Sequence, residues 1–356
     1  MEVLDLNLTN WRNFSSYKIA FDPKLTVIIG MNGAGKSNIL EALSLLSAIK
    51  PSKVETDVDL VGFGKSDAKI ESSIHNKSEK LELTVNFQVI DESYAKKSFF
   101  IGGIRKRLVD FSEHFSVVVF APSDLDLVSG SPSLRRHHLD SQLVVVDRDY
   151  WRNLSAYGKV TVRRNKILQR IAEGKSNKSE LDFWDERLFF HGDYISKKRQ
   201  DFFEFLNFVE PSFANVSKDT QKWLSGLSWS LKQSLISPDK LLKNREKDIA
   251  AGVTLSGPHR DDFMFLFSSK NLEFFGSRGE QRMALLALKL AELEYYSIKR
   301  GFRPILALDD IFSELDWEHR GAVLSIGDKQ QSIITAAEKE SLPPEIFKKA
   351  KVVVLK

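Results

Sequence analysis

Residues 24–49 read KLTVIIGMNGAGKSNILEALSLLSAI, and this stretch decides the fold. An apolar, β-branched run at 25–29 leads into a glycine-rich turn, and helix-period spacing of apolar residues begins at Lys36. The turn has the spacing GxxxxGK[ST], which between a strand and a helix is typical of a phosphate-binding loop, or P-loop. The sequence therefore predicts an α/β protein with a nucleotide site after this strand.

The residue types of this loop suit a phosphate anion. Glycines let the backbone turn tightly enough for its N–H groups to surround phosphate oxygens. Lys36 offers a compact positive charge to the β- and γ-phosphates, Ser37 offers a hydroxyl ligand to Mg²⁺, and the helix N-terminus adds its dipole. The predicted nucleotide-binding residues of the loop are Gly30, Met31, Asn32, Gly33, Ala34, Gly35, Lys36 and Ser37.

The overall composition is that of an ordinary globular chain, with 356 residues of which 42% are hydrophobic. There is no cysteine, which excludes disulfides and thiolate metal sites and fits a reducing cytosol. The first 14 residues lack the basic and apolar regions of a secretory signal, and no apolar run approaches the length of a membrane span. We therefore expect a cytoplasmic protein with no membrane partner.

Basic residues outnumber acidic ones only slightly, 52 against 48, so net charge alone does not indicate nucleic acid. Basic clusters do occur, at 105–107, 135–138, 163–164 and 197–199. Each is most simply a solvated face of the protein. Together they would form a phosphate-binding surface only if they lay on one face of the fold.

The remaining chain divides into a strand-rich and a helix-rich part. Alternating patterns predict strands at 3–8, 17–21, 69–74 and 81–90, followed by a hairpin at Gly102-Gly103 and a buried strand at 115–120. Apolar residues from 139 to 157 and again from 181 to 209 recur at helical spacing, with a polar breaker at 174–179. Two long helices forming an antiparallel arm are the simplest explanation.

A second half of the nucleotide site is predicted near the C-terminus. Residues 304–310, PILALDD, form a hydrophobic strand that ends in two carboxylates, as the Walker B strand of a Mg²⁺–nucleotide site does. We expect it to neighbour the P-loop strand in a parallel sheet. Just before it, residues 277–282 open a helical run at 283–296. This turn is either a second anion site or an ordinary helix start capped by Ser277.

Taken together, these motifs resemble the ATP-binding head of the ABC and SMC superfamily, with an SxGxQ-like signature turn at 277–281 and SELD at 313–316. Across essentially the whole chain, four further stretches resemble the RecF family of bacterial DNA replication and repair proteins. The stretches are 10–14 (NWRNF), 122–140 (PSDLDLVSGSPSLRRHHLD), 256–262 (SGPHRDD) and 311–316 (IFSELD).

The resemblance implies a P-loop ABC/SMC-type ATPase head with an added β-subdomain and a helical arm. We expect the N-terminal part of the head at 1–130, the arm at 131–247 and the C-terminal part of the head at 248–356. It further implies an ATP-dependent homodimer in which Ser277 and Gly279 of each copy meet the γ-phosphate on the other's P-loop. Such dimers bind DNA at gaps or single-strand/double-strand junctions and help RecO and RecR load RecA.

Individual residues acquire roles from the same resemblance. Asp309 and Ser37 would hold Mg²⁺, and Arg12 and Asn13 would lie at the nucleotide. Asp310 stands where a glutamate commonly orients the attacking water, and its shorter side chain leads us to expect a weak, DNA-dependent ATPase that works as a switch. From clustering alone, the candidate DNA contacts are Arg135, Arg136, Arg163 and Arg164.

The chain also departs from the pattern of related heads. No glutamine occurs at 121–123, where a Q-loop is expected, Glu280 replaces the signature glutamine, and residues 335–337 (TAA) lack the switch histidine. An ATPase subunit of a transporter would use the same chemistry, but roughly 270 residues separate Lys36 from Asp309, more than a compact transporter head needs. An ATP-dependent nuclease would need a further carboxylate-rich domain, which we do not expect here.

Overall fold

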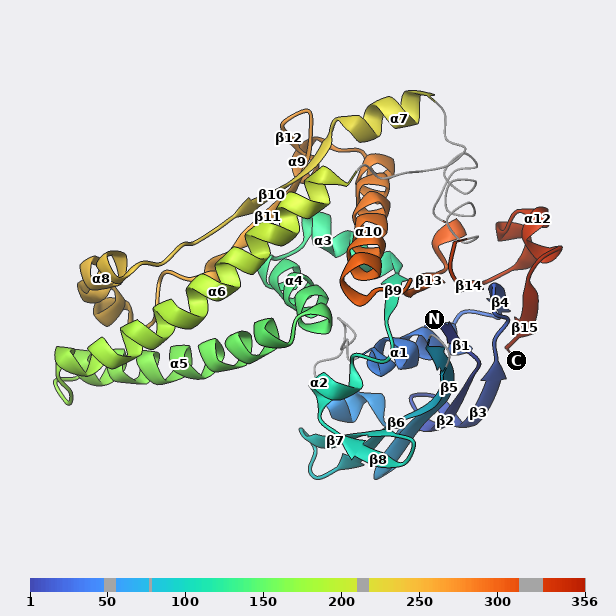
Figure 1. The fold of residues 1–356 in the computed structure, drawn as a ribbon, viewed down its shortest axis with the longest axis horizontal. Coiled ribbons are helices and arrows are strands. Elements are labelled where there is room, and N and C mark those ends of the chain that lie inside the picture. The colour runs from blue at the N-terminus through green and yellow to red at the C-terminus, as the bar shows by residue number, and fades with distance from the viewer. Residues whose placement is uncertain (48–55, 77–78, 210–217, 314–328, 356) are drawn as a thin grey trace.

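A five-stranded parallel sheet contains the P-loop strand and the Walker B strand and lies at the end of the molecule opposite the arm (Figure 1). The computed structural model describes residues 1–47, 56–76, 79–209, 218–313 and 329–355. The strand order is β15-β4-β14-β13-β9, and every neighbouring pair is parallel. The bounds are β4 (Leu25–Ile29), β9 (Val117–Phe120), β13 (Ile305–Asp309), β14 (Ser332–Ala336) and β15 (Lys351–Val354).

The Walker B strand is not the direct neighbour of the P-loop strand, so that expectation was wrong. β14 lies between β4 and β13 and pairs with both of them. The three strands are mostly apolar and almost entirely buried, which is typical of a parallel sheet with a layer on each side. The Walker A and Walker B segments consequently face each other across the end of one intervening strand.

Two layers cover the sheet. Side chains of β4 alternate between them, since Ile28 belongs to one buried cluster and Val27 and Ile29 to the other. The first cluster contains α1 (Lys36–Leu46) and the β-subdomain, and the second contains α10 (Arg278–Arg300) and the base of the arm. The helix that follows the P-loop and the base of the arm thus lie on opposite faces of the sheet.

The β-subdomain is an antiparallel sheet of order β3-β2-β5-β6-β7-β8, with β1 paired to β5. Gly102 and Gly103 both have positive φ, 55° and 78°, and connect β7 to β8, which confirms the predicted hairpin. The bounds are β1 (Glu2–Val3), β2 (Asp5–Trp11), β3 (Phe14–Ala20), β5 (Asp67–Asn76), β6 (Glu79–Val89), β7 (Ala95–Ile101) and β8 (Ile104–Lys106).

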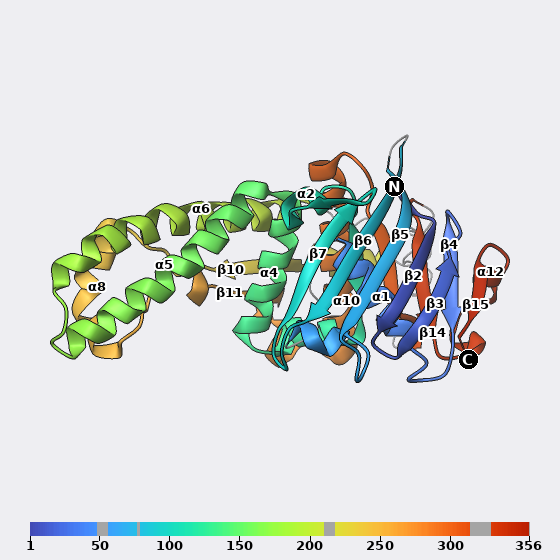
Figure 2. The same ribbon diagram turned by 90° about the horizontal axis from the view of Figure 1, so that it is seen from below.

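The helical arm extends from the head as an antiparallel pair, α5 (Arg148–Ala172) and α6 (Leu181–Phe208), as predicted (Figure 2). The helical pattern at 139–157 is divided between α4 (Pro132–Val146) and α5. The division occurs at Asp147, whose carboxylate accepts from Tyr150 N at 2.8 Å and caps α5. The proposed arm boundary at 247 falls inside α8 (Pro238–Ala251), which packs on α5 and α6.

Within the ranges that the structure describes, no helix is both long enough and apolar enough to cross a membrane.

Short helices and strands make up the remaining elements of the described residues. The elements are η1 (Asp57–Leu60), α2 (Leu108–Phe111), η2 (Pro122–Leu125), α3 (Asp126–Ser129), η3 (Lys178–Glu180), α7 (Lys218–Ser225), β10 (Leu227–Lys232), η4 (Pro258–Arg260), β11 (Asp262–Phe267), β12 (Lys270–Asn271), α9 (Leu272–Phe275), η5 (Ile311–Ser313), η6 (Lys339–Ser341) and α12 (Pro344–Phe347).

Candidate functional site

The P-loop connects β4 to α1 and has the backbone that its sequence predicts. Gly35 has φ 102°, and a Cβ there would lie 2.5 Å from the Phe14 ring and 2.8 Å from Asn13 Oδ1, so only glycine fits. The Lys36 ammonium is buried and donates to Gly30 O at 2.5 Å and to Met31 O at 3.1 Å. The positive charge is thereby held inside the turn of the loop.

The N-terminus of α1 is open to an anion. Its N-cap, Gly35, has no side chain that could accept from the first backbone N–H groups, and the first turn contains no acidic residue. Ser37 in this turn is exposed. Because the unsatisfied N–H groups carry the positive end of the helix dipole, this end of α1 suits a phosphate group.

Arg12 and Asn13, in the turn between β2 and β3, both support the P-loop. Asn13 Nδ2 donates to Ala34 O at 3.4 Å in the loop itself. The Arg12 guanidinium donates to Glu41 Oε2 of α1 at 2.9 Å and to Asp59 O at 3.0 Å. Arg12 therefore fixes the position of α1, and its contact with a nucleotide stays a prediction.

The two carboxylates at the end of β13 share one threonine. Thr335 Oγ1 at the end of β14 donates to Asp309 Oδ1 at 2.7 Å and accepts from Asp310 N at 2.9 Å. Asp310 has φ 48°, a left-handed conformation that is uncommon for a residue other than glycine. Thr335 belongs to the stretch 335–337, where the resemblance led us to expect a histidine, and its hydroxyl holds this turn in place. Glu314, Leu315 and Asp316 of the SELD string lie outside the described residues.

A cavity of about 360 Å³ connects the two motifs. Ser37 and Asp309 both line it, although 272 residues separate them in the sequence. The hydroxyl and carboxylate oxygens expected to bind Mg²⁺ therefore face one space. Besides these two residues, the cavity is lined by the charged or titratable side chains Glu41, Asp124, Asp126, His137, His138, Lys289 and Glu292.

A buried charge cluster, which the sequence analysis missed, forms one wall of this cavity. His138 Nε2 lies 2.5 Å from Glu292 Oε1, and Lys289 Nζ lies 3.6 Å from Glu292 Oε2 and 3.5 Å from Asp124 Oδ2. Burial alone would raise the pKa of Glu292, but His138 and Lys289 outweigh it and hold that pKa below its ordinary value. The available signal was a lysine and a glutamate three residues apart in the run 283–296, in which Glu294 is the only other charged residue.

The signature turn lies away from this cavity. Ser277 caps α10: its Oγ accepts from Glu280 N at 3.3 Å, and the Glu280 carboxylate accepts from Ser277 N at 2.7 Å. Neither Ser277 nor Gly279 lines the cavity, and the 12 residues from Ser277 to Lys289 correspond to about 18 Å of helix. Within one chain, Ser277 therefore caps helix α10 and does not contribute to the cavity.

The candidate DNA contacts are not on one surface. Arg135 is buried and forms a two-pronged pair with Asp262, at 2.6 Å and 2.9 Å. Arg136 is half-buried and donates to Asp261 O at 3.0 Å, whereas Arg163 is exposed. The prediction for Arg135 was wrong because its guanidinium is engaged inside the fold.

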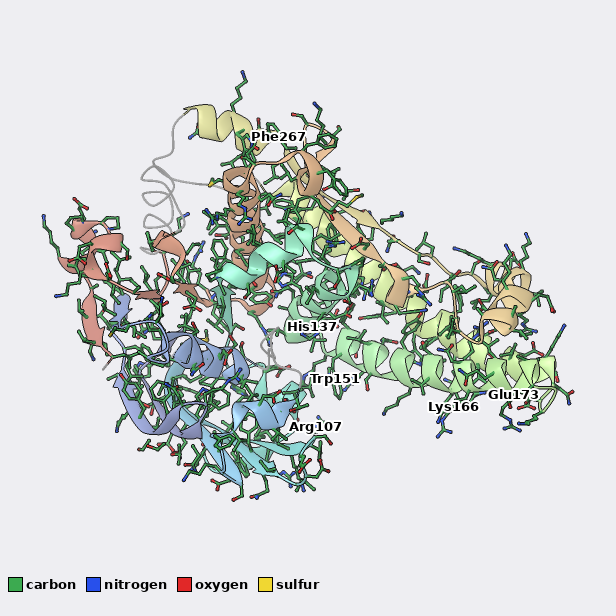
Figure 3. The ribbon with its side chains drawn as sticks, turned by 180° about the vertical axis from the view of Figure 1, so that it is seen from behind. Arg107, His137, Trp151, Lys166, Glu173 and Phe267 are labelled. Carbon is green, nitrogen blue, oxygen red and sulfur yellow. The ribbon has the colours of Figure 1, made fainter. Side chains whose placement is uncertain are left out.

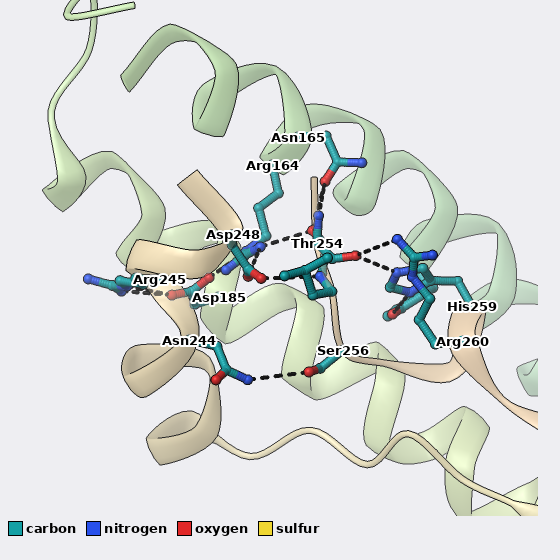
Figure 4. A network of polar contacts seen from close by, with 12 residues as sticks. Arg164, Asn165, Asp185, Asn244, Arg245, Asp248, Thr254, Ser256, His259 and Arg260 are labelled. Atoms are coloured by element: carbon teal, nitrogen blue, oxygen red, sulfur yellow. Dashed lines mark hydrogen bonds and ion pairs between the residues drawn. The ribbon is translucent and has the colours of Figure 1, made fainter. Parts of the chain in front are cut away.

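Arg164 is likewise buried, so the prediction of a surface role for it was also wrong. Its Nε donates to Asp185 Oδ1 at 2.7 Å and its Nη1 to Asp248 Oδ2 at 2.7 Å (Figure 4). Nη1 also donates to Thr254 Oγ1 at 2.9 Å. Arg164 thereby connects α5 to α6, α8 and the segment after α8.

The 256–262 string belongs to the same polar interior. Arg199 of α6 donates to Pro258 O at 2.7 Å and to Asp261 Oδ2 at 2.8 Å. His259 donates from Nε2 to Thr254 O at 3.0 Å and accepts from the Tyr157 hydroxyl at Nδ1, 2.7 Å away. These residues position the arm helices relative to one another, which explains why so many polar residues occur in this string.

Comparison with known proteins identifies the family. The family model "RecF/RecN/SMC N terminal domain" matches residues 2–352. A "DNA replication and repair protein RecF" from Moorella thermoacetica is 36% identical over 361 residues, covering 98% of this chain and 94% of the relative. The chain belongs to the RecF family. A RecF protein from Bacillus cytotoxicus is 33% identical and covers 100% of this chain and 97% of the relative.

A solved structure of a RecF protein has the same architecture. The structure of the recombination mediator protein RecF-ATP in the RecFOR pathway is 27% identical, with a TM-score of 0.84, and covers 96% of this chain and 93% of that one. The predicted fold class, an ABC/SMC-type head with a β-subdomain and a helical arm, is confirmed.

Proposed function

We propose that this chain is an ATP-dependent DNA-binding protein of recombinational repair and replication. It dimerises on ATP at gapped or junction DNA and helps RecO and RecR load RecA, with slow ATP hydrolysis as the switch. The names of its RecF relatives and the RecF-ATP structure support this function. The observation that carries the proposal is that Ser37 of the P-loop and Asp309 of the Walker B strand line one cavity. Lys36, the residue before Ser37, is buried and bonded to carbonyl groups of the loop.

In this proposal, residues 30–37 hold the phosphates of ATP through their backbone N–H groups and Lys36. Ser37 and Asp309 supply a hydroxyl and a carboxylate, which with phosphate oxygens and water suit the oxygen preference of Mg²⁺. The bound ion would neutralise phosphate charge. Thr335 orients Asp309 by its hydrogen bond, and Asp310 is aimed by the left-handed turn that the same threonine supports.

The separation of the two halves of the site supports a dimer. Ser277 and Gly279 lie at the far end of α10 from the cavity, so one chain cannot place them on its own nucleotide. In a two-fold dimer, the same surface is used twice and the signature turn of each copy can meet the P-loop of the other. Binding of ATP would then complete two sites at once.

The test measures binding to a gapped duplex, with and without ATP and Mg²⁺, together with the sedimentation mass. We expect ATP to produce a dimer and DNA binding together in the wild type, both to be lost in Lys36→Ala and Ser277→Ala, and both to persist longer in Asp310→Asn. Ser237→Ala is the matched control for Ser277→Ala. It removes the N-cap of α8, where Ser237 Oγ accepts from Lys240 N at 3.1 Å, with a similar loss of about 1 kcal/mol.

One result would overturn the proposal. If ATP bound to the wild type but changed neither its mass nor its DNA affinity, the chain would be the ATPase subunit of a different ABC-type assembly. Such an assembly would be a transporter or a nuclease complex, and the protein partner would have to be sought next. If Ser277→Ala and Ser237→Ala lost dimerisation and DNA binding to the same extent, the signature turn would act only as a helix cap.

A further inference from the structure

The outer face of α5 carries a row of basic side chains, which we call the α5 stripe: Arg152, Lys159, Arg163, Lys166 and Arg170. At 3.6 residues per turn, these positions fall within a sector of about 60°. All five residues are exposed. They extend over 18 residues, or about 27 Å of helix. The stripe is therefore straight, continuous along the arm and open to solvent.

The orientation of the stripe is fixed by the packing of the arm. Tyr157, Val160, Arg164 and Leu168 occupy the buried face of α5, against α6 and α8. Arg163 precedes Arg164 by one residue, so its side chain is rotated by about 100° from the buried face and is exposed. Figure 3 shows Lys166 standing off the side of α5 that faces away from α6.

Among the described residues, an ion pair partly neutralises only one of the five stripe side chains, Arg152. Within the part of the chain that the structure describes, no carboxylate forms an ion pair with Lys159, Arg163 or Lys166. Asp149, at the start of α5, is the single acidic residue of this helix and pairs with Arg152 at 2.8 Å. In contrast, α6 contains six acidic residues: Asp182, Asp185, Glu186, Asp193, Asp201 and Glu204. The arm thus has one strongly positive side.

We infer that the α5 stripe binds the phosphate backbone of a DNA duplex lying along the arm, an inference that rests on the proposed DNA-binding function. Lysine and arginine side chains in a row complement a phosphate backbone and read no base sequence. A length of about 27 Å corresponds to about eight base pairs. Sites for single strands combine positive charge with aromatic stacking platforms. The exposed positions of α5 include no aromatic residue, which favours a duplex.

The test neutralises the middle of the stripe in a triple variant, Lys159→Gln/Arg163→Gln/Lys166→Gln. A matched triple variant, Lys348→Gln/Lys349→Gln/Lys351→Gln, changes exposed lysines at the opposite end of the molecule (Figure 1). Each triple lowers the formal net charge by three, from +4 to +1, so long-range electrostatics are matched. Binding to duplex DNA is measured with ATP and Mg²⁺ between about 50 and 200 mM salt.

We expect the stripe variant to bind duplex DNA at least about tenfold more weakly, with a salt slope smaller by about 2.7, because each lost phosphate contact removes about 0.9. The control triple should keep the slope of the wild type. A second measurement uses the absence of cysteine from the chain. A photocrosslinker on Ser155→Cys, beside the stripe, should react with duplex DNA, whereas one on Glu204→Cys of α6 should not.

Two kinds of failure are distinguishable. If the wild type binds DNA and the stripe variant retains its slope and affinity, the stripe does not contact DNA while the proposed function stands. If the wild type binds no DNA in the presence of ATP, the proposed function fails and the inference fails with it. Loss of binding to phosphatidylserine vesicles, with DNA binding unchanged, would instead assign the stripe to an anionic lipid surface and would also overturn the inference.

Discussion

Replacing Arg164 with methionine should lower the free energy of unfolding of the arm by about 3–5 kcal/mol. The guanidinium is fully buried and lies 2.7 Å from both Asp185 and Asp248. Methionine fills a similar volume but leaves two buried carboxylates that have lost a cation. Asp185 keeps Arg245, 2.7 Å away, whereas Asp248 is only 1% exposed and keeps no ion pair among the described residues.

The magnitude therefore depends mainly on Asp248, and a second substitution can test this. Arg164→Met/Asp248→Asn removes the uncompensated charge along with the arginine, so part of the lost stability should return. Asp248 Oδ1 accepts from Leu255 N at 3.2 Å, and an asparagine oxygen can still accept this bond. A positive coupling in this double-mutant cycle would measure the ion pair itself.

Urea denaturation gives the change in free energy, and hydrogen exchange of the α5 and α6 amides assigns it to the arm. Arg163→Met is the matched control, because it makes the same chemical change on the exposed side of the same helix turn. We expect the control to remain within about 0.5 kcal/mol of the wild type. Similar unfolding midpoints for Arg163→Met and Arg164→Met, or no recovery in the double variant, would refute the reasoning.

Two other predictions concern single polar contacts. Burial and the neighbouring Arg260 hold the pKa of His259 below its ordinary value of 6.5, so the unfolded chain binds more protons below that pH. Stability should decline as the pH falls from about 6.5 toward 5, and His259→Gln should flatten this part of a pH series of urea melts; an unchanged curve would contradict the assignment. Thr335→Val should weaken Mg²⁺-dependent ATP binding about tenfold in calorimetric titration, because Asp309 loses the hydroxyl that orients it. Thr26→Val, a buried change in β4 of the same sheet, should leave that affinity intact, and an equal loss in both variants would indicate general damage to the sheet.

The sequence predicted those features of the fold that short segments determine. The P-loop, the β7–β8 hairpin and the paired arm helices follow from local spacing and turn residues. The placement of β14 between β4 and β13 could not be predicted in this way, because it depends on pairing between segments about 300 residues apart. Strand order within a parallel sheet is not encoded in any one strand.

For the candidate site as well, the sequence predicted local motifs but not contacts between distant segments. Ser37 and Asp309 were found by motif, but the cluster around Glu292 was not, since His138 lies 154 residues away from it. The burial of Arg164 could have been predicted from the helical period. Arg164 follows Tyr157 by seven residues and Val160 by four, so all three side chains lie on the buried face of α5. Adjacent arginines were treated as one surface cluster, although neighbours in a helix point in different directions.

The central sheet also determines when this protein can first bind a nucleotide during its synthesis. Both neighbours of β4, β14 and β15, come from residues 332–354. The Gln331 side chain also connects the C-terminal part of the chain to the N-terminal strand β1, since it accepts from Val3 N at 2.7 Å and donates to Val3 O at 2.8 Å. A growing chain therefore contains the complete P-loop sequence for some 300 residues before β4 has a partner strand. A nucleotide site that needs this sheet would therefore be complete only after residues 332–354 have been synthesised.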